Sequence, residues 1–358
     1  MEIINLVNNA SNFTDVISIC NMNGLYVKED NDYPSLYMIT YLHNDNLTNN
    51  LLRQCKGLIL EKNTNKIICY SLDKTLDKIE DLSTISRIEE SIDGTHIRLF
   101  YYNNKWNVAT SRCIDAKKAY WLYSNKNFYE LFQEAADYYH LNYNNLDKNC
   151  CYSFVLGHPE NRIVIKYKTP VLYHVLTRNL ITLKEEYQDI CIRKPDLFDY
   201  NLNDILNHST DRELINEGFM ICDINNNRLK VRNVIYQQLK ELRGNSYNLF
   251  YRFLELKQDN LVTLYLKFFP EMLMSFDVYE LNIHNMAMRI HLHYCNKYVN
   301  KLNPEIPGYL IKILNILHNY YLTTSQIITK KIVYKELYKL HPKQITYIYN
   351  RMFTQNSN

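Results

Sequence analysis

Short runs of apolar residues alternate with turn-forming residues over the first two-thirds of the chain, a pattern that indicates β-strands with short connections. Two pairs of runs predict hairpins: residues 95–102 with 106–110, and residues 218–222 with 229–232. Large apolar residues at helical spacing predict a helix within residues 116–140. Further strands are predicted at residues 36–42, 57–61, 67–70, 152–156, 162–167 and 171–176. The pattern therefore predicts a mixed domain of strands and helices.

The pattern changes after residue 243. Glycine is absent between Gly244 and Gly308, and large apolar residues recur there at three- and four-residue spacing. One such stripe comprises Leu249, Phe250, Phe253 and Leu254. This spacing places the apolar side chains on one face of a helix. We therefore predict two domains, a mixed domain over residues 1–243 and an all-helical domain over residues 244–358.

The composition is that of an average globular protein of 358 residues, with 46% apolar and 22% charged residues. The formal net charge of +3 is too small to indicate a class of partner. The chain has no run of about 18 apolar residues, so we expect no membrane-spanning helix. Its first residues lack the pattern of a signal peptide. Nine cysteines, none spaced as CxxC, predict free thiols in a reducing cytoplasm.

The candidate chemistry centres on the segment Ser91-Ile92-Asp93-Gly94. It matches the nucleotidyl-transfer signature Lys-x-Asp-Gly except at the first position, where serine stands in place of the nucleophilic lysine. No lysine occurs between Lys78 and Lys105, so a shift of register along the chain does not restore the amine. The segment therefore resembles a known nucleotidyl-transfer site that lacks its nucleophilic amine.

Six blocks, taken in order, resemble motifs of the ATP-dependent RNA ligases of the phage tRNA-repair type. The family writes these motifs R-E-C-R-G, K-F-F-N…E, K-x-D-G, F-E-x-x-x-P-x-N-R, E-G-x-V and x-K-x-K-x-x-x-Y. The matching blocks here are residues 53–57, 72–77 with Glu80, 91–94, 154–162, 217–221 and 229–236. Each block alone is weakly specific. Six in the right order over about two-thirds of the chain indicate common ancestry.

This resemblance implies an α+β fold, in which a nucleotidyltransferase adenylation domain with antiparallel sheets is followed by an all-α C-terminal domain. In the family, a lysine amine takes AMP from ATP and passes it to an RNA 5′-phosphate, and a 3′-hydroxyl then displaces the AMP. The resemblance therefore implies ATP and Mg²⁺ as cofactors if binding or activity is retained. It implies RNA ends, with a 5′-phosphate or a 3′-hydroxyl, as the partner.

Two departures from the family pattern affect chemistry. Ser91 replaces the nucleophile, and Val155 replaces a glutamate that in the family anchors the ribose or a metal-bound water. A serine hydroxyl is the poorer nucleophile unless a base stands beside it. Lys56 and Arg232 are swaps between lysine and arginine, which keep the charge but change the hydrogen-bond geometry.

The resemblance assigns roles residue by residue. The catalytic positions are Ser91, Asp93 and Glu217. The expected nucleotide or phosphate contacts are Lys56, Lys74, Gly94, Arg98, Lys230 and Arg232. No residue is assigned as a metal ligand.

We therefore predict an RNA ligase-like protein that has lost self-adenylylation but still binds RNA ends or a nucleotide, as a partner subunit or a decoy. Two alternatives stay open. The first is an active RNA ligase, or a ligase of pre-adenylylated RNA, that uses a non-standard site. The second is a purely structural or interaction protein with an empty pocket. A protein partner and a cytoplasmic location are further expectations, and no membrane association is expected.

Overall fold

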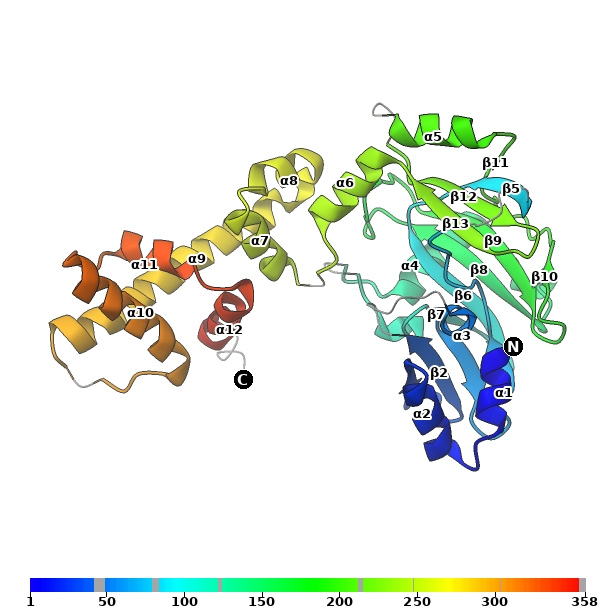
Figure 1. Cartoon of the computed structure of the whole chain (residues 1–358), viewed down its shortest axis with the longest axis horizontal. Helices are drawn as coiled ribbons and strands as arrows, with labels where there is room; N and C mark the ends of the chain where they lie inside the picture. Colours follow the sequence, from blue (N-terminus) through cyan, green and yellow to red (C-terminus); the bar gives the residue numbers. More distant parts are fainter. Residues whose placement is uncertain are drawn as a thin grey trace. The chain divides into compact units, whose positions relative to one another are not determined.

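The computed structural model describes residues 1–41, 49–78, 84–121, 124–211, 215–246, 248–302 and 304–353 (Figure 1). The chain divides into two compact units, Met1–Glu241 and Leu242–Asn358. The described strands all lie in the first unit, and the described elements of the second unit are helices. Within these ranges, no helix combines the length and the apolar character needed to cross a membrane.

The first sheet is antiparallel, with the order β1-β2-β3-β4. Its strands are β1 (Leu25–Glu29), β2 (Leu36–Tyr41), β3 (Leu58–Glu61) and β4 (Ile67–Cys69). Side chains of β2 alternate between two buried faces. Tyr37 packs with the covering helices, whereas Met38 packs with Phe100 of the second sheet. The covering helices are α1 (Glu2–Asn8), α2 (Phe13–Met22) and α3 (Asn50–Gln54).

The second sheet is also antiparallel and has the order β10-β9-β8-β6-β7. Its strands are β6 (Thr95–Tyr102), β7 (Lys105–Thr110), β8 (Cys150–Gly157), β9 (Val171–Asn179) and β10 (Glu185–Glu186). Asn103 and Asn104 have positive φ, 50° and 58°, as the centre of a type I′ turn requires, so the predicted hairpin is confirmed. Helix α4 (Phe128–Tyr138) covers this sheet, where Phe132 packs on Phe154.

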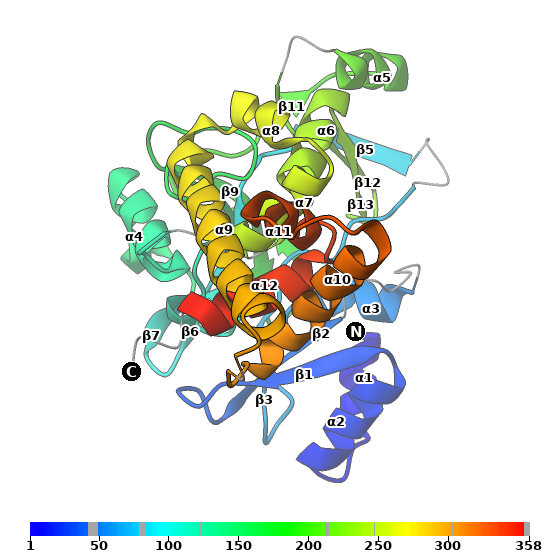
Figure 2. The same cartoon turned by 90° about the vertical axis from the view of Figure 1, so that its left-hand side faces the viewer.

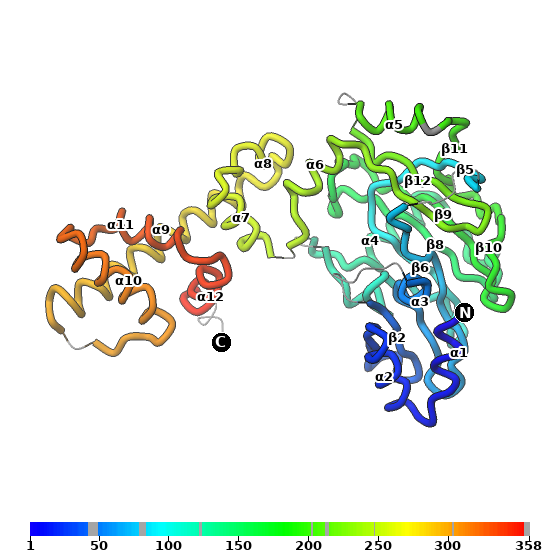
Figure 3. The backbone as a smooth tube through the Cα atoms, in the orientation of Figure 1, coloured from blue at the N-terminus to red at the C-terminus, as the bar shows by residue number. Residues whose placement is uncertain are grey.

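The third sheet has the order β11-β5-β12-β13, again antiparallel. Its strands are β5 (Ile85–Glu90), β11 (Leu197–Phe198), β12 (Gly218–Asp223) and β13 (Arg228–Arg232). Helix α5 (Leu202–Thr210) packs Ile205 against this sheet, and α6 (Val234–Arg243) follows β13 directly (Figure 3). The segment of residues 91–94 connects β5 of the third sheet to β6 of the second. It therefore lies at the junction of the two sheets.

One predicted strand is wrong. Residues 162–167 form no strand, because the backbone N–H groups of Val164 and Ile165 donate to the carboxylate of Asp93 instead of to a neighbouring strand. The other predicted strands are present, with ends shifted by up to three residues.

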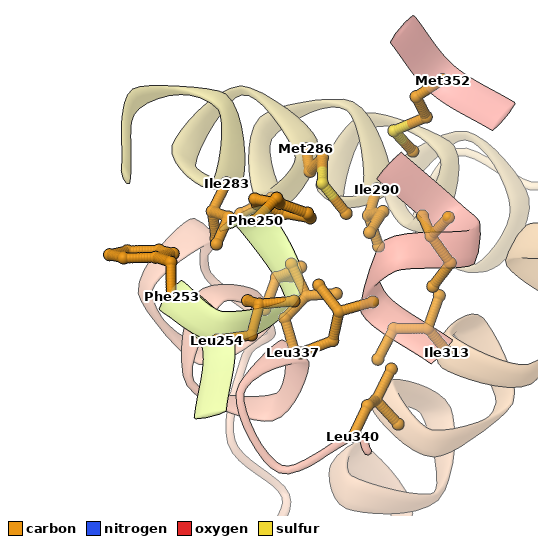
Figure 4. Packing of buried hydrophobic residues seen from close by; sticks show 14 of the residues in the cluster. Phe250, Phe253, Leu254, Ile283, Met286, Ile290, Ile313, Leu337, Leu340 and Met352 are labelled. Carbon is orange, nitrogen blue, oxygen red and sulfur yellow. The ribbon is translucent and has the colours of Figure 1, made fainter. Parts of the chain in front are cut away.

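The second unit is helical. Its elements are α7 (Leu249–Gln258), α8 (Val262–Phe268), η4 (Pro270–Met272), α9 (Leu273–Tyr294), η5 (Cys295–Val299), α10 (Gly308–Thr324), α11 (Lys330–Leu337) and α12 (Pro342–Phe353). Helix α9 contacts α7, α10, α11 and α12 (Figure 2). The predicted stripe is buried here: Phe250, Phe253 and Leu254 pack with Met286 and Leu337 (Figure 4). The predicted fold class, antiparallel sheets of an α+β region followed by an all-helical region, is confirmed.

Candidate functional site

The Ser-Ile-Asp-Gly segment is fixed to both sheets at its junction. The Ser91 side chain is buried; its backbone N–H donates to the Gly218 carbonyl at 2.9 Å and its hydroxyl donates to Glu217 Oε2 at 2.9 Å. Gly94 packs directly on β8, where a Cβ atom would lie 2.5 Å from the Leu156 carbonyl oxygen. Glycine is therefore needed at this position to let the two backbones approach.

The carboxylate of Asp93 is a buried anchor. Its Oδ2 accepts hydrogen bonds from the N–H groups of Val164 at 2.9 Å and Ile165 at 2.7 Å. Its Oδ1 accepts a hydrogen bond from the Tyr236 hydroxyl at 2.7 Å. Burial raises the pKa of Asp93, although these hydrogen bonds oppose the shift. Asp93 thus ties the segment to residues 162–167 and to helix α6.

The carboxylate of Glu217 is surrounded by basic side chains. It is buried and accepts a hydrogen bond from Lys230 Nζ at 2.9 Å. Two further cations lie near Oε1, Arg232 Nε at 3.7 Å and Lys240 Nζ at 3.8 Å. Burial alone would raise the pKa of this carboxylate, but Lys230, Lys240 and the Ser91 hydroxyl lower it below its usual value. Glu217 is therefore ionised at neutral pH and is a weak base.

A cavity of about 300 Å³ opens beside Ser91. Its basic lining residues are Lys56, Lys74, Arg228, Lys230 and Arg232. Its acidic lining residues are Asp73, Glu89 and Glu90. Gly94, His96 and Val155 also line it. Because basic side chains outnumber acidic ones, the cavity favours an anionic ligand.

Lys56 and His96 both line the cavity, and both bind protons weakly. Burial and the charges of Lys230, Arg98 and Arg228 lower the pKa of Lys56 to about 8. Burial and the neighbouring cations, Lys56 among them, lower the pKa of His96 well below its usual value. The imidazole of His96 is therefore neutral near pH 7 and adds no charge to the cavity.

The structure brings most of the predicted site residues together. Those that line the cavity are Lys56, Lys74, Ser91, Gly94, Lys230 and Arg232. Asp93 and Glu217 are buried and are not among the lining residues. The prediction for Arg98 requires correction: this side chain is fully buried, and its guanidinium donates to the carbonyls of Gly57 and Thr110. Arg98 thus connects chain segments in the interior and does not face a phosphate.

Two residues of helix α6 that build the site were not predicted. Tyr236 holds Asp93, and Lys240 lies beside Glu217. A signal was available in the sequence, because Tyr236 closes the last motif block and Lys240 follows it by four residues, on the same helical face. Glu80, which belongs to the second block, lies outside the described residues.

The described residues offer no cluster of side chains that would hold a metal ion without a ligand's help. Among them, no group of three or more His, Cys, Asp or Glu side chains is placed to hold one. Asp93 already accepts three hydrogen bonds, and Glu217 is paired with cations. Val155 offers no oxygen. The basic lining repels a bare divalent cation but suits anionic groups such as phosphates.

Comparison with known proteins gives two curated relatives, both viral. No family model matches the chain. The chain is 24% identical over 317 residues to the immediate-early protein ICP-46 homolog of Invertebrate iridescent virus 3, covering 80% of this chain and 70% of that protein. It is 25% identical over 223 residues to the "Putative bifunctional polynucleotide kinase/RNA ligase" of Autographa californica nuclear polyhedrosis virus. The resemblance to RNA ligases is confirmed. The second match covers 54% of the RNA ligase-like chain. It covers 32% of the viral protein, so the chain spans about a third of the viral protein's length.

The RNA ligase-like chain is also similar to solved ligase structures. It matches Naegleria gruberi RNA ligase with PPi at a TM-score of 0.33 and 9% identity, covering 43% of this chain and 51% of that one. It matches a mutant of the same ligase with ATP and Mn at a TM-score of 0.34 and 9% identity, covering 44% and 52%. The chain spans about half the length of these ligase chains.

Proposed function

We propose that the first unit is an RNA ligase-like nucleotide-binding domain. It holds ATP, or the 5′-phosphate end of an RNA, in the cavity beside Ser91. Ser91 itself stores no AMP, so the protein is impaired in self-adenylylation at the position that a ligase uses. The observation that carries this proposal is the basic lining of the cavity by Lys56, Lys74, Lys230 and Arg232.

Two of these cations are available to an anionic ligand. Arg232 is 38% exposed, and its Nε lies 3.7 Å from Glu217, beyond the range of a strong hydrogen bond. Lys74 lies over the ring of Tyr41 at 5.7 Å and has no ion pair within the described part of the chain. Charge-assisted hydrogen bonds to phosphate oxygens are stronger than neutral ones, so these groups gain most from a bound phosphate.

The environment of Ser91 opposes nucleophilic attack by its hydroxyl. Glu217 lies 2.9 Å from that hydroxyl, within reach for a general base. However, Glu217 has a lowered pKa and accepts a hydrogen bond from Lys230, so transfer of the hydroxyl proton to it is unfavourable. An AMP ester on serine would also transfer AMP less readily than the phosphoramidate of a lysine.

Calorimetric titration with ATP, and with a 5′-phosphorylated oligoribonucleotide, tests the proposal. Lys74→Ala should weaken binding roughly tenfold, which corresponds to about 1.4 kcal/mol. Lys148→Ala is the matched control, because Lys148 also lies over a tyrosine ring, that of Tyr101 at 4.8 Å, but is exposed and outside the cavity. Failure of ATP, GTP and RNA to bind at millimolar concentration would reject the proposal in favour of a purely structural protein.

The proposed partner and location have separate support. The relative described as an RNA ligase supports RNA as the partner of this chain. All nine cysteines are free, which supports a reducing compartment such as the cytoplasm.

A further inference from the structure

Compared with the family motifs, the cavity lacks a lysine at position 91 and has an additional lysine at position 56. Ser91 stands where the Lys-x-Asp-Gly signature has its amine, and Lys56 stands where the R-E-C-R-G motif has arginine. Both residues line the same cavity of about 300 Å³. A guanidinium stays protonated in proteins and does not act as a nucleophile, whereas a lysine amine can. The swap at position 56 therefore brings a nucleophile into the space from which another is missing.

Lys56 differs from the other amines of the site in its partners. Lys230 donates to Glu217 at 2.9 Å, and Lys240 lies 3.8 Å from the same carboxylate. Such ion pairs favour the protonated amine. Lys56 is half-buried, and within the described ranges it has neither an ion pair nor a hydrogen bond from its amine. Lys74, the remaining lysine of the lining, also has no ion pair within the described ranges, but its amine lies over the Tyr41 ring at 5.7 Å, and such a cation–π contact favours the protonated form. Among the lysines that line the cavity, Lys56 is therefore the one whose amine is least restrained in the charged form.

The electrostatics of the cavity agree with this geometry. Burial and the charges of Lys230, Arg98 and Arg228 lower the pKa of Lys56 from 10.5 to about 8. At pH 7 this shift increases the fraction of free amine about 300-fold over that of an ordinary lysine. Lys56 thus carries a usable lone pair near physiological pH.

We propose that Lys56 accepts AMP from ATP in this protein, an inference that rests on nucleotide binding in the cavity as proposed above. The Nζ lone pair attacks the α-phosphorus, and a phosphorus–nitrogen bond forms. The bond between the α-phosphorus and its bridging oxygen breaks, pyrophosphate leaves with the electron pair, and the amine proton passes to solvent. Lys230 and Arg232 line the same cavity and offset the negative charge of the phosphates.

Covalent labelling with ATP radiolabelled at the α-phosphate, in the presence of Mg²⁺, tests this role. The wild-type protein should form an acid-labile adduct that peptide mass mapping places on Lys56. Lys56→Arg should abolish the adduct, because it keeps the positive charge and removes the nucleophile. Lys28→Arg should label like the wild type, since Lys28 is another half-buried lysine with a lowered pKa but lies outside the cavity.

The pH dependence of labelling tests whether the attacking amine has the lowered pKa of Lys56. With its pKa near 8, the labelling rate should rise about 50-fold between pH 6 and pH 8 and then level off. A rate that continues to rise tenfold per pH unit up to pH 10 would point to a lysine with an ordinary pKa and would contradict the assignment.

Ser91→Lys provides a positive control, because it restores the amine of the signature in the same cavity. An adduct in Ser91→Lys but not in the wild type, with ATP binding measured by calorimetry in both, would overturn the role of Lys56. An adduct mapped to any other wild-type residue would also overturn it. If the protein binds the 5′-phosphorylated oligoribonucleotide but not ATP, the role of Lys56 fails and the proposed function stands. If it binds neither ATP, GTP nor RNA, both fail.

Discussion

The Glu217–Lys230 pair allows a quantitative test of how the site is built. The Glu217 side chain is 4% exposed and that of Lys230 is 21% exposed, and their charged atoms lie 2.9 Å apart. The informative changes are Glu217→Gln, Lys230→Met and the double variant. Each single change leaves one charge without its closest partner, whereas the double variant replaces both charges by neutral side chains.

The expected magnitudes follow from burial. Removing one partner of a buried ion pair costs about 3–5 kcal/mol, whereas exposed pairs contribute about 0–1 kcal/mol. Because Lys230 is partly exposed, Glu217→Gln should cost about 3 kcal/mol. Lys230→Met should cost about 1–2 kcal/mol, since Arg232 and Lys240 remain beside the carboxylate. The double variant should cost about 1–2 kcal/mol less than the sum.

Urea unfolding followed by tryptophan fluorescence measures these free energies for the first unit alone. Both tryptophans of the chain, Trp106 and Trp121, belong to that unit. Equal m-values among the variants would show that the same surface is exposed on unfolding. Additivity of the two single effects within about 0.5 kcal/mol would refute the coupling. Unchanged stability of Glu217→Gln would refute the argument from burial.

Three further predictions concern stability. Tyr236→Phe removes the hydroxyl that donates to Asp93 at 2.7 Å, and it should lower the free energy of unfolding by about 1.5–3 kcal/mol in the same urea assay, because the acceptor is charged. The pKa of Glu217 is lowered in the folded chain, so its ionisation stabilises the fold at higher pH; the free energy of unfolding should fall as the pH drops below 4.5, less so in Glu217→Gln. Leu337→Ala in the core of the second unit should cost about 2–5 kcal/mol by circular dichroism and leave ATP binding unchanged.

Local signals in the sequence predicted strands well where alternation and turn residues coincide. The hairpin at Asn103-Asn104 is an example, because both residues accept the positive φ that its turn demands. The helix predicted within residues 116–140 is present, but it occupies only Phe128–Tyr138 of that range. Asn127 and Glu130 form a capping box that starts α4 at Phe128, so the start of the helix is encoded in the sequence.

Contacts between distant segments limited the rest of the prediction. Residues 162–167 have strand-like composition, yet their backbone N–H groups bond to Asp93, about 70 residues away in the chain. Motif order was sufficient to collect Lys56, Ser91 and Lys230 at one site. Motif order could not show that the Lys230 amine would be paired with a carboxylate and the Lys56 amine would not, because this pairing depends on how the sheets meet.

Arg98 is a buried residue that connects two backbone segments by hydrogen bonds. Its guanidinium binds the carbonyl of Gly57, the residue next to Lys56, and Gly57 has no room for a side chain because a Cβ atom would lie 2.6 Å from the Ser111 carbonyl oxygen. A fully buried guanidinium therefore holds the backbone next to Lys56. Redesign of the cavity for a new ligand would have to preserve the hydrogen bond from Arg98 to Gly57, although Arg98 does not line the cavity.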